Sequence, residues 1–262
     1  MMANSKKSSR IEKMAIIVGN WKMYKTIEES QEFVKNLLPF IQEGGPKVYL
    51  AVPFTLIRPV SDEASQTPLV VGAQNMNDAE EGAFTGEIAG KMLVDAGAKF
   101  VILGHSERRR LFNETDEFIN KKVRRALKDG LQPVLCVGET WDEREAGQTK
   151  KVLEEQLKIC LAGVKKEEIA EVIIAYEPVW AIGAPLPATK EMAEEAISYC
   201  RTFIEESWRE PAIGTLSILY GGAVNADNAD SFLSQPNIDG LLVGGASLTV
   251  EAFSKIINRH FV

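Results

Sequence analysis

The sequence predicts an α/β protein, a closed (β/α)8 barrel that forms a single domain. Eight short apolar runs alternate along the chain with longer segments of helical periodicity. The runs are apolar at every position rather than at alternate positions, which is typical of parallel strands that crossover helices bury on both faces. Eight such strand–helix units in about 250 residues are the usual size and pattern of a barrel.

The predicted strands are rich in Val, Ile and Leu, and they lie at residues 15–20, 47–52, 69–74, 99–104, 131–139, 171–176, 216–222 and 239–245. Apolar residues at helical spacing predict helices between them, for example at residues 27–41, 116–128, 150–161, 190–208 and 248–258.

The main alternative is a doubly wound open sheet. The segment after the first run, GNWKMY (19–24), lacks the GxGxxG phosphate turn that such sheets carry there. No linker-like stretch divides residues 15–262, so we expect them to form one catalytic domain. Residues 1–14, MMANSKKSSRIEKM, are basic and polar, and we expect a flexible N-terminal extension there.

Composition and charge exclude several classes of protein. With 30 Lys and Arg against 37 Asp and Glu, the net charge is −7, which argues against nucleic-acid binding. No apolar run approaches the roughly 18 residues of a membrane span. The three cysteines, Cys136, Cys160 and Cys200, are widely spaced and odd in number, so they predict neither a disulfide framework nor a thiolate metal site. A cytoplasmic location fits best.

Polar residues follow most of the apolar runs, and a barrel places its active site at that end of its strands. The candidates are Asn20, Lys22, Gln74, Asn75, His105, Glu107, Glu139, Glu177 and the glycine pairs 221–222 and 244–245. One rim therefore combines a cation, an imidazole, carboxylates and two places where the backbone can approach a ligand. Glycine pairs after the seventh and eighth strands predict a phosphate site, although they could serve only as tight turns.

Histidine usage limits the chemistry. The chain has two histidines, His105 and His260, so no zinc or iron site can be built from a histidine cluster, and we expect no metal. His105 stands where a strand ends, a position that suits acid/base or hydrogen-bonding chemistry, although it could simply end the strand.

Glu177 and Lys22 each allow more than one interpretation. A long apolar segment with Trp180 and Ile182 follows Glu177 and would partly remove its carboxylate from water, which favours a general base. The alternative is a buried carboxylate paired with Lys22 or with an arginine of residues 106–110. Lys22 could be a Schiff-base nucleophile, a surface cation or an electrostatic clamp, and the clamp fits best beside a phosphate site.

Seven segments resemble the triosephosphate isomerase family, in the family's order and across nearly all of the chain after residue 14. They are GNWKMY (19–24), GAFTGE (82–87), ILGHSERR (102–109), PVLCVGET (133–140), AYEPVWAIG (175–183), LYGGAV (219–224) and LLVGGASL (241–248). The resemblance implies a TIM barrel that interconverts dihydroxyacetone phosphate and D-glyceraldehyde 3-phosphate through an enediolate. That reaction belongs to glycolysis and gluconeogenesis and needs no cofactor.

The resemblance also implies roles for single residues. Glu177 would move a proton between C1 and C2, and His105 would act as the neutral imidazole for which this family is a well-known example. Lys22 would stabilise the enediolate, with Glu107 positioning it, and Asn20 would contact the substrate. The implied phosphate ligands are the backbone groups of Gly183, Ala223, Gly244 and Gly245.

The implied lid consists of Pro178, Val179, Trp180, Ala181, Ile182, Gly183, Ala184, Pro185, Leu186, Pro187, Ala188 and Thr189. The chain departs from the family here, because Ala184, Pro185 and Leu186 replace the usual Thr-Gly-Lys and Ala223 replaces a serine. Thr85, on the loop from Asn75 to Glu87, resembles the residue that enters the neighbouring subunit, which implies a homodimer. Two alternatives stay open: a Schiff-base aldolase using Lys22, and a catalytically weakened barrel with an altered lid.

Overall fold

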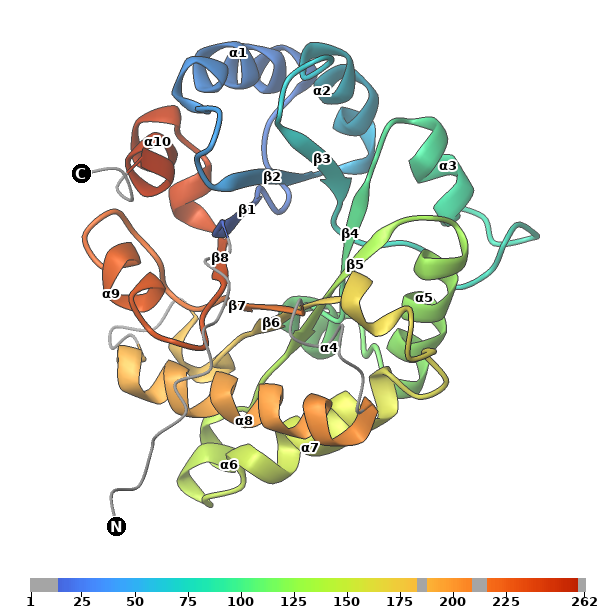
Figure 1. Cartoon of the computed structure of the whole chain (residues 1–262). Coiled ribbons are helices and arrows are strands. Elements are labelled where there is room, and N and C mark those ends of the chain that lie inside the picture. The colour runs from blue at the N-terminus through green and yellow to red at the C-terminus, as the bar shows by residue number, and fades with distance from the viewer. Residues whose placement is uncertain (1–13, 183–187, 209–215, 259–262) are drawn as a thin grey trace.

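Residues 14–182, 188–208 and 216–258 are described by the computed structural model. Eight parallel strands close into a barrel in which each strand pairs with the next and the last pairs with the first, and helices surround it (Figure 1). The strands are β1 (Ile16–Asn20), β2 (Lys47–Val52), β3 (Val70–Ala73), β4 (Phe100–Leu103), β5 (Gln132–Val137), β6 (Ile173–Tyr176), β7 (Ser217–Tyr220) and β8 (Gly240–Val243). The predicted fold class and all eight predicted strands are confirmed.

The described helices surround the barrel, except for α4, which overlaps the strands in the view of Figure 1. They are α1 (Ile27–Leu37), α2 (Ile57–Glu63), α3 (Gly90–Asp95), α4 (Ser106–Leu111), α5 (Asp116–Lys128), α6 (Trp141–Glu145), α7 (Thr149–Cys160), α8 (Lys190–Trp208), α9 (Ala229–Leu233) and α10 (Val250–Asn258). Short 3-10 helices are η1 (Leu38–Phe40), η2 (Phe54–Leu56), η3 (Ile169–Glu171), η4 (Val179–Ala181) and η6 (Gly245–Ser247). None of these helices is long and apolar enough to cross a bilayer.

The strands are uniformly apolar because alternate residues serve two separate cores. Val18, Ala51 and Ile102 belong to a small cluster made of strand residues alone, which fills the barrel interior. Ile17 and Leu50 belong to the larger cluster, which also includes helix residues and lies between strands and helices. A strand with one face in each core has no solvent-facing side, and this accounts for the pattern in the sequence.

Local sequence signals set both ends of helix α1. Its start is set by a capping box, in which the Thr26 hydroxyl accepts from the Glu29 N–H and the Glu29 carboxylate accepts from the Thr26 N–H. The helical segment predicted to residue 41 extends to Phe40, but it changes after Leu37 from the α-helix to the 3-10 helix η1. Pro39 has no N–H to continue the α-helical hydrogen bonds.

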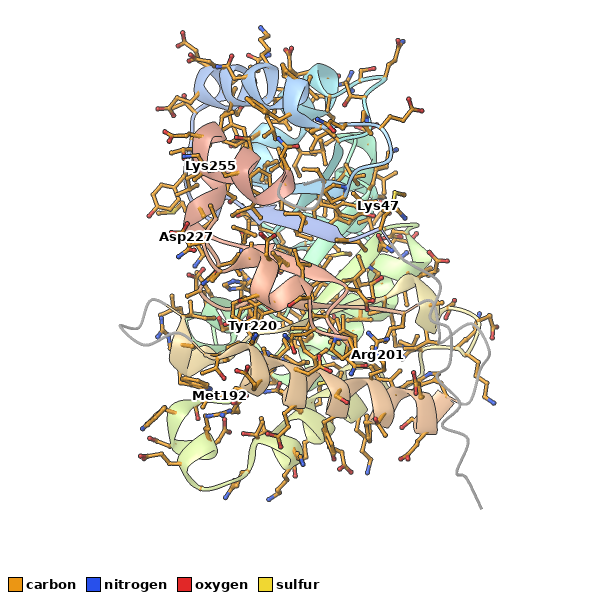
Figure 2. The ribbon with its side chains drawn as sticks, turned by 60° about the vertical axis from the view of Figure 1, so that its left-hand side comes forward. Lys47, Met192, Arg201, Tyr220, Asp227 and Lys255 are labelled. Atoms are coloured by element: carbon orange, nitrogen blue, oxygen red, sulfur yellow. The ribbon has the colours of Figure 1, made fainter. Side chains whose placement is uncertain are left out.

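The barrel's two rims lie on opposite sides of the molecule. Figure 2 shows Lys47, where β2 begins, and Asp227, which follows β7, on opposite sides. Arg201 of α8 pairs with Asp239 at 2.6 Å and donates to the Leu216 carbonyl. These contacts connect the helix to the beginnings of β7 and β8. The polar residues and glycines of the candidate site lie at the other rim, at the carboxyl ends of the strands.

Of the predicted extension at residues 1–14, only Met14 is described, and it is exposed. The three cysteines are buried, and none of them forms a disulfide. The loop between β3 and α3 leaves the barrel beside α3 (Figure 1). Its base is closed by the Asn77 N–H, which donates to the Ile88 carbonyl at 2.8 Å, and its tip carries the exposed Thr85.

Candidate active site

A cavity of about 330 Å³ opens at the carboxyl-end rim of the barrel. It is lined by Asn20, Lys22, His105, Glu177, Ile182, Gly221, Gly222, Ala223, Val224, Leu242, Gly244, Gly245 and Ala246. The structure therefore brings together ten of the predicted site and lid residues from five different strand ends: Asn20, Lys22, His105, Glu177, Ile182, Gly221, Gly222, Ala223, Gly244 and Gly245. Gly183, another predicted phosphate ligand, lies outside the described residues.

His105 and Glu177 form the most buried pair in this cavity. His105 Nε2 lies 3.0 Å from Glu177 Oε1, and their side chains are 8% and 2% exposed. The second carboxylate oxygen of Glu177 accepts from the Ser106 N–H at 2.8 Å. Glu177 is thus not the buried partner of Lys22 or of a nearby arginine that the alternative interpretation required. Ser106 was not predicted, because it acts through its backbone N–H, which every residue except proline has.

The hydrogen bonds around His105 assign its tautomer. Nδ1 accepts from the Glu107 N–H at 3.2 Å, since the His105 side chain caps helix α4. A nitrogen that accepts carries no proton, so the proton of the neutral ring is on Nε2, the atom that faces Glu177. The helix start thereby leaves Nε2 as the donor that faces the cavity.

Lys22 forms an ion pair with Glu107 whose Nζ and Oε1 atoms are 2.6 Å apart. The backbone of Lys22 has a φ of 53°, and Gln74 and Asn20 stabilise this conformation. The Gln74 amide donates to the Lys22 carbonyl, while the Asn20 side chain accepts from the Lys22 N–H. Partial burial would raise the pKa of the Glu107 carboxyl, but the hydrogen bond from Lys22 and the several basic groups close to the carboxylate hold it below its ordinary value.

Glycines keep the backbone close to these side chains. A Cβ at Gly221 would lie 3.1 Å from Cγ of Glu177, and a Cβ at Gly244 would lie 3.5 Å from Cε of Lys22. Gly138, which was not predicted, is tighter still, because its Cβ would lie 1.7 Å from the Glu177 carbonyl oxygen. Larger residues at these positions would displace Glu177 or fill the cavity.

The described part of the predicted lid is residues 178–182, 188 and 189. The Trp180 ring was expected beside Glu177, but its indole N–H donates to Glu139 at 2.9 Å and its ring packs edge-on against Trp141. Arg144 lies over the Trp180 ring and pairs with Glu139. A fully buried carboxylate such as Glu139 needs donors, and an indole N–H supplies one.

The rest of the lid divides into two parts. Ile182 lines the cavity with Glu177, as expected. Ala188 is buried, and Thr189 accepts from the Met192 N–H where α8 begins. Residues 183–187, which are Gly183, Ala184, Pro185, Leu186 and Pro187, lie outside the described residues.

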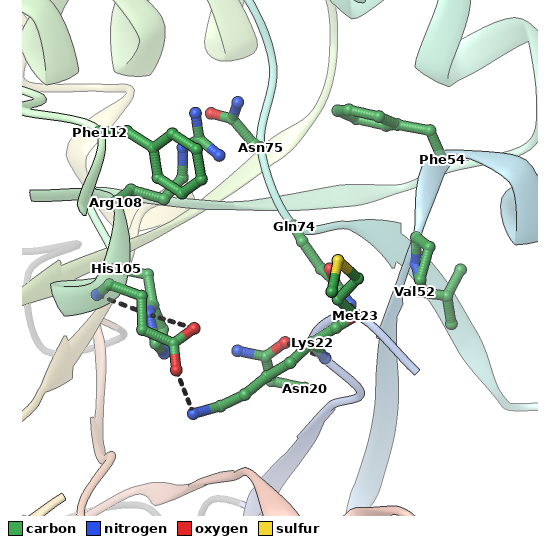
Figure 3. Close-up of a pocket in the computed structure, with 12 residues that line it drawn as sticks. Asn20, Lys22, Met23, Val52, Phe54, Gln74, Asn75, His105, Arg108 and Phe112 are labelled. Atoms are coloured by element: carbon green, nitrogen blue, oxygen red, sulfur yellow. Dashed lines mark hydrogen bonds and ion pairs between the residues drawn. The ribbon is translucent and has the colours of Figure 1, made fainter. Parts of the chain in front are cut away.

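A second cavity, of about 370 Å³, lies on the other side of Lys22. It shares Asn20, Lys22 and His105 with the first, but its remaining lining is largely apolar: Met23, Val52, Pro53, Phe54, Gln74, Asn75, Glu107, Arg108 and Phe112. Figure 3 shows Phe54 and Phe112 on opposite sides of this cavity and the ion pair of Lys22 as a dashed line. Met23 is 93% exposed and Phe112 is 62% exposed.

The residues that the structure describes contain no group of three or more His, Cys, Asp or Glu side chains that could hold a metal ion. The reactive groups on this rim are an imidazole, a buried carboxylate and a paired ammonium. Together with the closed barrel they define a (β/α)8-barrel enzyme with an acid/base active site.

Comparison with known proteins identifies the family. The family model of triosephosphate isomerase matches residues 15–260, and the chain belongs to the triosephosphate isomerase family. It is 55% identical to a triosephosphate isomerase from Protochlamydia amoebophila over 93% of this chain and 92% of that one. It is 47% identical to one from Acetivibrio thermocellus, over 92% and 96%.

A solved structure agrees with this assignment. The triosephosphate isomerase of Bartonella henselae, 35% identical, superimposes with a TM-score of 0.84 over 92% of this chain and 97% of that one. The predicted enzyme class, an isomerase of triose phosphates and hence of glycolysis, is confirmed at the level of the family. The roles of single residues stay predictions.

Proposed function

We propose that this chain interconverts dihydroxyacetone phosphate and D-glyceraldehyde 3-phosphate by proton transfer through an enediolate, with Glu177 as the base, His105 as the electrophile and Lys22 as the stabilising cation. The observation that carries the proposal is the 3.0 Å contact between Nε2 of His105 and the Glu177 carboxylate inside a glycine-lined cavity. A base and a neutral donor in contact are the pair that proton transfer next to a carbonyl requires.

The proton movements balance with these groups alone. Glu177 takes a proton from C1 of the ketose, and the electron pair of that C–H bond forms the enediolate C=C bond. The carbonyl oxygen of C2 receives negative charge and accepts the Nε2 hydrogen bond of His105. Return of the proton to C2, with transfer of a proton between the two oxygens through His105, gives the aldose. Binding of a carbonyl oxygen to Nε2 would release Glu177 Oε1 from His105 and leave it free to act as the base.

Lys22 supplies fixed positive charge beside the developing oxyanion. Its pairing with Glu107 at 2.6 Å holds the ammonium in place, which suits electrostatic stabilisation. A Schiff-base nucleophile must instead lose its proton before it attacks a carbonyl. The ion pair therefore supports the clamp over the aldolase alternative.

The phosphate would lie against the backbone of the two glycine turns. Gly244, Gly245 and Ala223 line the same cavity as His105, and small residues at these positions leave N–H groups accessible to an anion. Asn20 would contact the substrate from β1, and Gly183 would complete the phosphate site by resemblance to the family. We propose a cytoplasmic location for the reaction.

A coupled assay for glyceraldehyde 3-phosphate formation from dihydroxyacetone phosphate tests the proposal. We expect turnover without added cofactor and no trapped adduct when borohydride is added with substrate. A borohydride-trapped adduct on Lys22 would identify an aldolase. Binding of inorganic phosphate without turnover would identify a weakened barrel, in which the departures at residues 184–187 and at Ala223 have removed activity.

We infer that the protein forms a homodimer in which each Thr85 loop enters the apolar cavity of its partner. The loop tip exposes Phe84 and Thr85, while the cavity exposes Met23, Phe54 and Phe112. Large apolar side chains in that exposed cluster are typical of a contact surface. A protruding loop and a recess on one chain suit a two-fold dimer, in which each surface meets its complement twice.

A further inference from the structure

The turn after β8 has one end at the proposed phosphate site. Gly244, Gly245 and Ala246 line the cavity that holds Glu177. The first hydrogen bond of the turn, from the Ser247 N–H to the Gly244 carbonyl at 2.8 Å, uses neither the Gly245 nor the Ala246 N–H. A second bond, from the Leu248 N–H to the Gly245 carbonyl at 3.1 Å, links the far end of the turn to the residues that carry these N–H groups.

The other end of the same turn is held by side chains from the loop after β1. The Trp21 indole N–H donates to the Ser247 carbonyl at 3.1 Å, and the Lys25 ammonium donates to the Leu248 carbonyl at 2.8 Å. The loop that carries Lys22 into the cavity thus also holds the two carbonyls that end the glycine turn. These contacts join parts of the chain more than 200 residues apart, since Lys25 and Leu248 are separated by 223 positions.

The amino group of Lys25 is fixed on several sides. It lies 5.2 Å from the centroid of the Trp21 ring and 4.6 Å from that of Phe33, and the two rings pack edge-on. Cation–π contacts of this kind stabilise a charged amine that has lost part of its water. Burial lowers the pKa of Lys25, although the nearby Glu29 opposes that effect.

The backbone of Lys25 also has an unusual conformation. Its φ is 77°, in the left-handed region that side chains other than glycine rarely adopt. Such a conformation persists when surrounding contacts stabilise it. The contacts available are the two rings and the Leu248 carbonyl, so this backbone and the amine contact belong to one arrangement.

The geometry points to Lys25 as a positioning residue for the phosphate-binding turn: its ammonium holds the carbonyl end of residues 244–248 and thereby keeps the N–H groups of Gly245 and Ala246 in place for a phosphate. Lys25 itself lines neither of the two rim cavities. The inference rests on the proposed phosphate site at this turn. Loss of the amine would weaken binding of every phosphate-bearing ligand while leaving the chemistry at Glu177 and His105 nearly unchanged.

The test compares Lys25→Met with wild type, because methionine keeps an unbranched stem beside Trp21 and removes the donor. We expect the competitive inhibition constant of inorganic phosphate and the KM for glyceraldehyde 3-phosphate to rise roughly 5- to 10-fold. The kcat should stay within about 2-fold of wild type. Lys25→Arg, which keeps the charge and a donor, should recover much of the affinity. An unchanged phosphate inhibition constant in Lys25→Met would overturn the inference.

Lys25→Gly is a second variant in case methionine disturbs folding. Glycine adopts the positive φ without strain, so this variant removes the amine but favours the same backbone. It should show the same loss of phosphate affinity. The matched control is Lys35→Met on α1, whose amine is largely exposed and 3.7 Å from Glu63, and it should bind phosphate like wild type.

Gly245→Asp separates failure of the inference from failure of the proposed function. An added Cβ at Gly245 meets nothing within 4 Å, so aspartate places a negative charge in open space beside the proposed phosphate. Strong loss of phosphate inhibition in Gly245→Asp, with none in Lys25→Met, would overturn the role of Lys25 alone. Unchanged phosphate inhibition in Gly245→Asp would overturn the phosphate site, and the role of Lys25 with it.

Discussion

The two cavities on the rim share Asn20, Lys22 and His105 but differ in the rest of their lining. The cavity with Glu177 is lined by glycines and small residues, whereas its neighbour is lined by Met23, Phe54 and Phe112. Glycines leave backbone N–H groups accessible, which suits a small anion that the chain can bind by itself. Exposed aromatic side chains suit contact with another protein surface. The difference predicts two kinds of binding at one rim, with the ion pair of Lys22 and Glu107 between them.

The largest effect is expected from Glu177→Asp, which withdraws the carboxylate of the glycine-lined cavity by one methylene. The kcat should fall at least ~10²-fold, because proton transfer requires close contact with the reacting carbon. The inhibition constant of inorganic phosphate should stay near the wild-type value. Glu171→Asp, an exposed position just before β6, is the control. Wild-type turnover in the Glu177 variant would remove this residue from the mechanism.

A change confined to the apolar cavity should act through assembly. Phe112→Asp places a charge in the proposed dimer contact, and it should raise the dimer dissociation constant at least about 30-fold. Analytical ultracentrifugation over a concentration series measures this. Phe40→Asp is the control, because Phe40 is 41% exposed but lines neither rim cavity. Equal dimer stability in both variants would show that the second cavity is not the contact.

The ion pair of Lys22 and Glu107, which lies between the two cavities, should make the stability of the fold depend on pH. Because the pKa of Glu107 is lowered in the folded chain, its ionised form stabilises the fold above the ordinary carboxyl pKa, and that contribution is lost as the pH falls through the lowered value. Wild type should therefore exceed Glu107→Gln in Tm at pH 6 by no more than about 2–4 °C, since the pair is partly exposed. The gap should close below about pH 4. A gap that persists in acid would contradict this charge effect.

Chelation of metal ions is expected to leave the activity unchanged, which is the smallest of the predicted effects. The described lining of both cavities offers no cluster of metal-binding side chains, and the proposed proton transfers need none. Activity measured in the coupled assay should be the same with and without EDTA. Loss of activity on chelation, restored by a divalent metal ion, would contradict the cofactor-free mechanism.

Much of the candidate site could be predicted because the fold leaves few choices. Parallel strands that close into a barrel bring their carboxyl ends together, so polar residues after apolar runs must meet at one rim. Lys22, His105 and Glu177 followed from this reasoning. The contacts of Trp180 did not, because the sequence next to it suggested Glu177 as its neighbour, whereas the buried Glu139 accepts its N–H.

The sequence by itself determined the eight strands, their order and the polar groups on one rim, because apolar runs buried on both faces are a local pattern that a chain cannot satisfy in many ways. Only the tertiary structure decided which of those groups are partners. Glu177 contacts His105 rather than Lys22, and Lys25 reaches Leu248, 223 positions away. Such pairs depend on barrel closure and on side-chain directions set by packing, and neither is recorded in local residue patterns.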